Sequence, residues 1–331
     1  RVYVHARLEP LAKERVLTRL DAGDDDPGTI DGGACVADGA DVDHAGLVPE
    51  AEQRVGPVIL KRGGHQLGLR VDGHVGPQLF LENVQHQRVV GAAQHDRLHG
   101  GIYFPEEEVG NARLFCEALL RYCINAGVTL RFNETVVDIE VDAKRVRALV
   151  TDRETIELDA IVLAGGSFTW PLAKKVGINV PVRPAKGYSI TLPMGELDPK
   201  PRHAVVDEHL HAAVVPLGGQ RFRVAGTAEF TGFDDTVNPA RIENLKVLLK
   251  MVYPQVSCRD DQVEGWCGFR PMTPDGKPII GSTKVQGLYL CTGHGPLGWT
   301  LACGSGKSLA ELMVGKEPEY DISGFAFGRY R

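Results

Sequence analysis

Hydrophobic positions recur with a helical period in three segments of the chain, at 111–126, 239–252 and 298–314. In the first segment the apolar positions fall on one face, and Gly127 follows where a glycine commonly ends a helix. The face comprises Leu114, Phe115, Ala118, Leu119, Tyr122 and Cys123. The pattern therefore predicts three helices, the first of which packs this face against a sheet.

Short runs rich in hydrophobic residues predict strands between these helices. They occur at 128–132, 136–141, 146–151, 156–158, 160–164, 188–192, 212–216, 222–226 and 287–290. The run 160–164 is apolar throughout and leads into Gly165-Gly166, which is typical of a parallel strand covered on both faces. The sequence therefore predicts an α/β fold in which a parallel, helix-covered sheet accompanies a second, mixed or antiparallel sheet.

Residues 1–98 are atypical and poorly patterned. Residues 1–99 hold seven of the eleven histidines but only two aromatic residues, Tyr3 and Phe80, a mixture that no ordinary domain composition predicts. One interpretation is a poorly ordered leader. The interpretation that we favour is a segment translated from another frame or strand, or joined artificially to the rest of the chain.

The composition of the chain argues against several classes of binding partner. The formal net charge of −6 and the pI near 6.0 argue against a nucleic-acid binder, because such proteins carry a basic surface. The seven cysteines show no paired CxxC spacing, which indicates free thiols in a reducing compartment and no metal site. No apolar run approaches the ~20 residues of a membrane span. We expect a cytoplasmic protein, either free or attached peripherally at the inner face of the cytoplasmic membrane.

The candidate chemistry lies near the end of the chain. Arg270 stands between a short apolar strand and a Pro274-Asp-Gly276 turn, and a glycine-dense loop at 293–298 then leads into a helix. A guanidinium makes two parallel hydrogen bonds to a carboxylate. A helix N-terminus offers free amides to an electron-rich ring. The combination is suited to holding a carboxylate beside a flat cofactor.

These motifs, together with Pro184-Ala-Lys-Gly-Tyr188 and the run 159–170, resemble those of FAD-dependent amine oxidoreductases of the D-amino acid oxidase superfamily, and most of all the bacterial D-amino acid dehydrogenase (small subunit) family. The resemblance covers about residues 99–331. It implies a Rossmann-like FAD domain, built from 99–185 and 260–331 and here incomplete, and a substrate domain at 186–259. The GxGxxG unit that opens such a domain is absent, since neither Gly63-Gly64 nor Gly73 begins that spacing.

The resemblance also implies which residues contact FAD. Val136 and Val137 would lie against the adenine. The loop after the apolar strand and the glycine-dense loop would contact the flavin. Their candidate residues are Ala164, Gly165, Gly166, Gly293, Gly295, Leu297, Gly298, Trp299 and Thr300.

The activity implied is oxidative deamination of a D-amino acid to a 2-oxo acid and ammonia, with electrons passed to an acceptor such as a quinone. Arg270 would bind the substrate carboxylate. Tyr188 would either contact the substrate or pack in the interior, and His294 would have either a catalytic or a structural role. Two alternatives stay open. The chain could be an inactive fragment unable to hold FAD, or a related glycine- or sarcosine-type amine oxidase, because Arg270 specifies only a carboxylate.

Overall fold

The structure is a computed structural model that describes residues 3–4, 58–62, 79–82, 98–104, 109–198, 200–207, 211–218 and 220–330. Its largest element is an eight-stranded sheet in the order β14-β10-β13-β12-β11-β2-β4-β3. Neighbouring strands are antiparallel except β11 and β2, which are parallel. The strands are β2 (Val58–Arg62), β3 (Leu79–Glu82), β4 (Leu98–Tyr103), β10 (Arg183–Pro193), β11 (Val205–Asp207), β12 (Ala212–Leu217), β13 (Arg221–Glu229) and β14 (Glu264–Met272).

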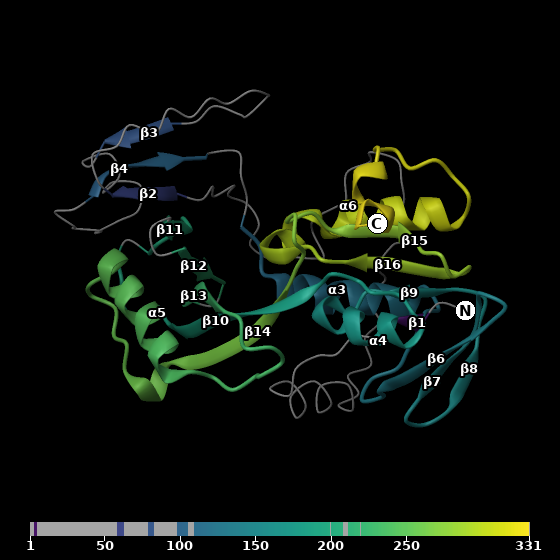
Figure 1. Ribbon diagram of the computed structural model, residues 1–331. Helices are drawn as coiled ribbons and strands as arrows, with labels where there is room; N and C mark the ends of the chain where they lie inside the picture. Colours follow the sequence, from purple (N-terminus) through teal and green to yellow (C-terminus); the bar gives the residue numbers. More distant parts are fainter. Residues whose placement is uncertain are drawn as a thin grey trace.

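Helix α5 (Pro239–Val252) covers one face of this sheet beside β10, β12 and β13 (Figure 1). It begins where the Asn238 side chain accepts a hydrogen bond from the Ala240 amide and where Pro239 presets the first helical dihedral. Its buried positions are Leu245, Leu248, Leu249 and Val252, which follow the spacing of a single apolar face. They pack with the strands into one hydrophobic core, so the opposite face of the sheet is left for other contacts.

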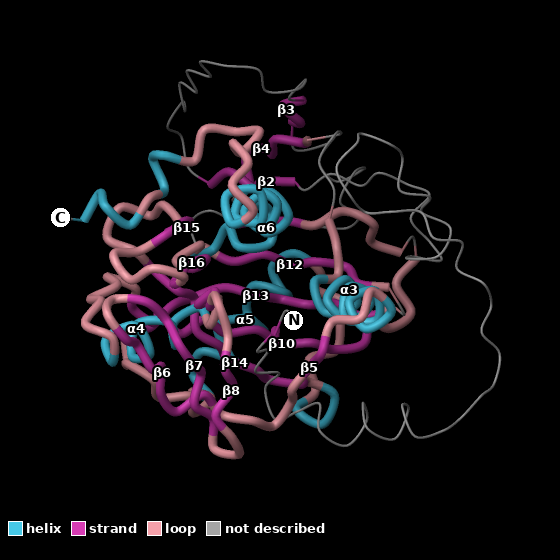
Figure 2. The backbone as a smooth tube through the Cα atoms, turned by 90° about the vertical axis from the view of Figure 1, so that its right-hand side faces the viewer, coloured by secondary structure: helices cyan, strands magenta, loops and turns pink. Residues whose placement is uncertain are grey.

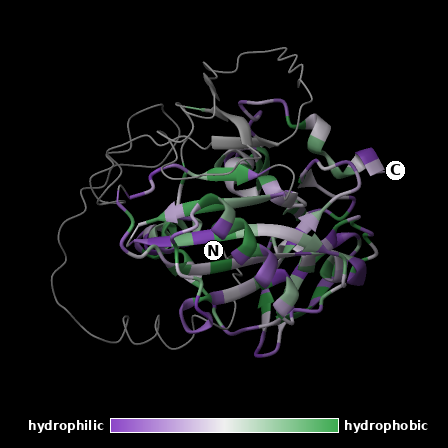
Figure 3. Ribbon diagram, turned by 90° about the vertical axis from the view of Figure 1, so that its left-hand side faces the viewer, coloured by the Kyte–Doolittle hydropathy of each residue, from purple (hydrophilic) through white to green (hydrophobic). Residues whose placement is uncertain are grey.

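A second core lies around a three-stranded sheet of β15 (Ile279–Ser282), β16 (Leu288–Thr292) and β9 (Ile161–Leu163), in which β16 and β9 run parallel. Helices α4 (Thr169–Lys175) and α6 (Gly298–Met313) follow β9 and β16 in the chain. Figure 3 shows hydrophobic positions along the strands and adjoining helices, with hydrophilic positions concentrated toward the outer edge. The predicted α/β fold with a largely antiparallel second sheet is confirmed, and in the smaller sheet β9 and β16 are parallel whereas β15 and β16 are antiparallel.

The remaining elements are small. Strands β6 (Val136–Asp142), β7 (Arg145–Thr151) and β8 (Thr155–Glu157) form an antiparallel sheet that lies together in Figure 2. Strand β5 (Thr129–Leu130) pairs in parallel with β1 (Tyr3–Val4). Short 3-10 helices lie at η3 (Gly166–Phe168), η4 (Asp260–Gln262), η5 (Gly295–Leu297), η6 (Ser323–Phe325) and η7 (Phe327–Tyr330). No helix among the described residues is both long enough and apolar enough to cross a bilayer.

Helix α3 (Ala112–Asn125) confirms the predicted helix but not its predicted packing. The Asn111 side chain caps its start, and Gly127 follows its end with φ +81°. None of its residues is buried, and Leu114 is 56% exposed. The reason is that no described helix or strand packs extensively against α3.

The predicted domain boundaries stay a prediction, and strand pairing crosses them. Strand β14 was assigned to the FAD-domain part at 260–331, but it pairs with β10 over nine register positions, so it belongs to the sheet expected at 186–259. Strand β4 joins that sheet rather than the part at 99–185, and β2 and β3, within the atypical residues 1–98, join it as well. The larger sheet thus draws its strands from segments on both sides of the predicted limits, and local composition does not reveal this pairing.

Candidate active site

The two predicted glycine loops meet at the carboxyl ends of neighbouring parallel strands. Leu163 of β9 lies opposite Leu290 of β16, and each strand then runs into its loop. The buried Thr292 hydroxyl donates a hydrogen bond of 2.9 Å to the Gly166 carbonyl, which joins the loops directly. Ligands of open α/β sheets bind at this edge of the sheet, so the arrangement suits a cofactor.

Three glycines allow these loops to lie close to strand β14. Gly293 has φ +79°, and an added Cβ there would lie 2.6 Å from Cγ2 of Thr273. Gly166 has φ +55°, a conformation that side-chain-bearing residues seldom adopt. An added Cβ on Gly295 would lie 3.3 Å from the Met272 sulfur. The end of β14 is therefore packed against both loops, which places Arg270 next to them.

Arg270 lies within β14, which continues to Met272, rather than between a strand and a turn as predicted. Its guanidinium stacks over Gly187 of β10, where an added Cβ would lie only 2.8 Å from Cζ. Its Nη1 donates to the Thr227 carbonyl at 2.9 Å. Burial lowers the pKa of Arg270.

Among the described residues, no carboxylate lies within ion-pair distance of Arg270. The nearest acid in the sequence, Asp275 of the turn, is already paired with Arg329 at 2.8 Å. Since charged groups withdrawn from water normally have a partner of opposite charge, Arg270 has the properties expected of a ligand-binding group.

Thr227 also belongs to this site, although no sequence motif includes it. It is skipped in the pairing of β10 with β13, where Gly187 lies opposite Ala228 and Tyr188 opposite Gly226. Its φ of +55° is unusual for a β-branched residue. Its buried hydroxyl has no hydrogen-bond partner among the described residues. Strained residues with unsatisfied polar groups are concentrated at functional sites. No sequence signal marks this bulge.

Tyr188 and Lys186 lie in a buried polar network. Tyr188 is 1% exposed, and its hydroxyl donates to Glu229 at 2.6 Å. Lys186 Nζ donates to Asp234 at 2.9 Å and to the Thr236 carbonyl at 3.0 Å. Burial alone lowers the pKa of Lys186, but the hydrogen bonds to Asp234 and Tyr188 more than offset this and raise it. The structure gives Tyr188 a packing role, and substrate contact by Tyr188 stays a prediction.

This network anchors the loop after β13 against an aromatic cluster. Phe233 of that loop stacks on Phe168 with ring centroids 5.0 Å apart, and it meets Phe269 edge-on at 5.7 Å. Trp170 is parallel to Phe233 at 6.4 Å. The cluster joins η3, which follows the Gly165-Gly166 loop, to β14, which carries Arg270. No periodic pattern predicts this cluster, because its members come from three separate segments.

The His294 side chain has a hydrogen-bond partner on helix α6. Its Nε2 lies 2.9 Å from the Ser305 hydroxyl of α6, and burial lowers its pKa. Trp299 makes an edge contact with Phe115 of α3 at a centroid distance of 5.5 Å. The Trp299 ring also fills the space beside Gly110, where an added Cβ would lie 2.4 Å from it. Flavin contact by these side chains stays a prediction.

Val136 and Val137 lie in the separate β6-β7-β8 sheet. The register of β6 on β7 passes from Val136 to Asp138, so Val137 has no pairing partner on β7. The side chain of Val137 is 41% exposed. A bulge of this kind leaves backbone groups available for a ligand, which is consistent with the predicted adenine contact without testing it.

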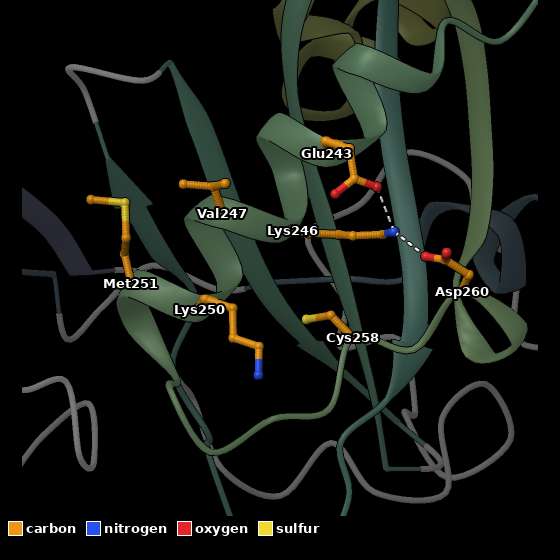
Figure 4. Close-up of a pocket in the computed structure, with 7 residues that line it drawn as sticks. All are labelled: Glu243, Lys246, Val247, Lys250, Met251, Cys258 and Asp260. Carbon is orange, nitrogen blue, oxygen red and sulfur yellow. Dashed lines mark hydrogen bonds and ion pairs between the residues drawn. The ribbon is translucent and has the colours of Figure 1, made fainter.

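A hollow of about 570 Å³ lies elsewhere, on the outer side of α5 (Figure 4). Lys246 extends across it and bonds Glu243 and Asp260, so its charge is already satisfied. None of the predicted site residues lines this hollow. It is a surface depression unrelated to the chemistry around Arg270.

Comparison with known proteins agrees with this geometry. The family described as DAO, FAD dependent oxidoreductase, matches residues 66–312. The chain belongs to this family. The match begins before residue 99, where the resemblance was expected to start, so part of the atypical segment belongs to the family's sequence pattern.

Two curated relatives carry the name D-amino acid dehydrogenase. The protein from Bradyrhizobium diazoefficiens is 41% identical over 239 residues, which are 72% of this chain and 56% of that protein. The one from Methylobacterium radiotolerans is 42% identical over 240 residues, 72% of this chain and 57% of that protein. The chain thus spans a little more than half the length of these relatives. Among solved structures, glycine oxidase from Geobacillus kaustophilus has a TM-score of 0.72 at 23% identity, covering 83% of this chain and 74% of that one, which shows the shared fold.

Proposed function

We propose that this chain carries out FAD-dependent oxidative deamination of D-amino acids, giving 2-oxo acids and ammonia. The observation that carries the proposal is Arg270, a partly buried guanidinium with no carboxylate partner among the described residues, packed beside two glycine loops at the carboxyl ends of parallel strands. The names of the two relatives support a D-amino acid substrate and an acceptor other than oxygen.

Arg270 would hold the substrate carboxylate through two parallel hydrogen bonds and so fix the face that the substrate Cα presents. The contact of Nη1 with the Thr227 carbonyl and the packing over Gly187 restrict the orientation of the guanidinium before the substrate arrives. Its role is orientation, because a guanidinium keeps its proton at all ordinary pH values. A lysine would supply charge without the planar fork.

The described residues fit the flavin end of FAD. Ser167 and Thr169 are buried, and their hydroxyls have no hydrogen-bond partner among the described residues, directly after the Gly165-Gly166 turn. They could hydrogen-bond a polar ring edge, and the start of α6 at Gly298 offers free backbone amides. When bound, FAD would accept the hydrogen and two electrons of the substrate Cα–H bond. We further propose a quinone or another compound as the final acceptor, with peripheral contact at the cytoplasmic membrane if that acceptor is a membrane quinone.

The test is a visible absorption spectrum of the purified chain after incubation with FAD and removal of unbound cofactor. We expect flavin bands that D-alanine bleaches in the absence of oxygen. Arg270→Lys should bleach far more slowly at equal D-alanine concentration, because the bidentate contact is lost. Arg259→Lys, which alters an exposed arginine paired with Asp261 at 2.7 Å, is the matched control and should behave like the original chain. A colourless protein, or equal bleaching in both variants, would refute the proposal.

A further inference from the structure

A second arginine, Arg223, shares the sheet face of Arg270. Side chains of a strand alternate between its two faces, so Gly187 and Ser189 of β10 point to the same side. The guanidinium of Arg270 lies over Gly187. Arg223 Nη2 donates to the Ser189 hydroxyl at 2.9 Å. Two cationic groups from β14 and β13 thus approach the same face of the strand that runs between them.

This face is the one that α5 leaves uncovered. The residues buried against α5 on β13 are Phe222 and Val224, which flank Arg223 in the sequence and point to the opposite side. The guanidinium of Arg223 lies over the Trp266 ring, 5.6 Å from its centroid, and this cation–π contact stabilises its position. Gly268 makes room for that ring, since an added Cβ there would lie 2.3 Å from it. Arg223 is therefore held in a defined position.

Neither guanidinium has a carboxylate within ion-pair distance in the part of the chain that the structure describes. Burial lowers the pKa of Arg223, as it does that of Arg270. Arg221, two residues earlier on β13, differs because it forms an ion pair. Its Nη2 lies 2.7 Å from Glu264. Partly buried charges normally have a partner of opposite sign. Two of them on one face, both without such a partner, indicate a ligand with two negative groups.

The spacing sets the size of that ligand. Positions two residues apart on a strand are separated by about 6.6 Å. Each guanidinium can accommodate one carboxylate through paired hydrogen bonds, and Arg223 has donors beyond the one that Ser189 occupies. A short carbon chain that carries a carboxylate at each end matches this separation. An uncharged side chain would leave Arg223 without its partner.

We propose that Arg223 binds the side-chain carboxylate of the substrate, so that the site selects D-amino acids with short acidic side chains, of the kind of D-glutamate. This inference rests on the proposed function, in which Arg270 binds the α-carboxylate. Arg223 is a specificity-determining residue in this arrangement and takes no part in the reaction at Cα.

The test is calorimetric binding of D-glutamate and of D-glutamine to the full chain, a pair that differs in charge but hardly in size. We expect D-glutamate to bind about tenfold or more tightly, since hydrogen bonds between charged groups are worth that much. Arg223→Gln should weaken D-glutamate binding to about the level of D-glutamine binding and so remove the preference. Arg221→Gln, the matched control on the same strand and face, should retain the preference.

Two further variants separate the possible failures. Arg270→Gln should lower the affinity for D-glutamate and for D-glutamine by the same factor, because it removes the contact with the α-carboxylate that both ligands make. Arg223→Lys keeps a positive charge and should keep part of the preference, so it replaces Arg223→Gln if thermal unfolding shows that variant to be unfolded. A preference for D-glutamate that survives in the folded Arg223 variants, or equal affinity for both ligands in the original chain, overturns the assignment of Arg223 alone. Failure of both ligands to bind overturns the proposed function and this inference together.

Discussion

Replacing Gly187 by alanine tests whether the position of Arg270 governs substrate binding. Gly187 does not have a positive φ, so an alanine there keeps the backbone unstrained. The only clash is with the guanidinium, since the new Cβ would lie 2.8 Å from Cζ of Arg270. The substitution therefore perturbs Arg270 without changing its chemistry or its charge.

The size of the perturbation follows from ordinary contact distances. Non-bonded carbon atoms lie about 3.5–4.0 Å apart, so the guanidinium must move by about 0.7 Å or more. A displacement of about 1 Å can cost about a hundredfold in rate when it misaligns reacting groups. We expect kcat/KM for D-alanine, measured after reconstitution with FAD, to fall by about two orders of magnitude. Folding stability should change by about 1 kcal/mol at most.

The control is Gly324→Ala, at a glycine with open space around it and no positive φ. It should leave both kcat/KM and stability close to those of the original chain. Calorimetric affinity for D-alanine provides a second readout, which should weaken only in Gly187→Ala. If Gly187→Ala is folded and binds and oxidises D-alanine as well as the original chain, the reasoning that Arg270 holds the carboxylate is wrong.

Three other substitutions address neighbouring features. Thr292→Val removes the buried hydroxyl that donates to Gly166, and we expect the free energy of unfolding in chemical denaturation to fall by about 1 kcal/mol, because the partly buried Gly166 carbonyl loses its donor. Thr227→Val removes a buried hydroxyl without a described partner, so stability should stay equal or rise; a clear loss would show that the hydroxyl is satisfied. Burial lowers the pKa of His294, so below about pH 6.5 the unfolded chain binds the proton more readily and stability should decline; denaturation curves from pH 7 to 5 should show a smaller decline in His294→Gln, and an equal decline would contradict the assignment.

Local sequence patterns were sufficient to predict most elements from residue 111 onward. Helix α5 begins and ends at the predicted residues 239 and 252, because an asparagine cap, a proline at the first turn and one apolar face all act within a few residues. Strands β7, β12 and β16 lie within two residues of their predicted bounds. In each case the residues that predict the element lie within the element or directly beside it.

The features that the sequence did not predict depend on partners distant in the chain. The exposure of α3 reflects the lack of an extensive packing partner among the described elements, and the membership of β14 in the larger sheet depends on nine pairs with β10. Similarly, Arg270 could be identified from its neighbours in the motif, whereas Arg223 could not. An isolated arginine in an alternating strand resembles Arg221, and only the presence or absence of a carboxylate across the sheet distinguishes the two.

The hydrogen bond between Thr292 and Gly166 joins residues 126 positions apart. During synthesis, β9 and its glycine loop leave the ribosome long before β16 exists, and the whole of β10 to β14 must be made in between. Closing so long a loop is slow, because its entropic cost must be met before the contact that it makes can contribute. The two halves of the site should therefore come together late in folding. A ligand that contacts both loops would bind only the folded state and would therefore stabilise the intervening sheet against unfolding.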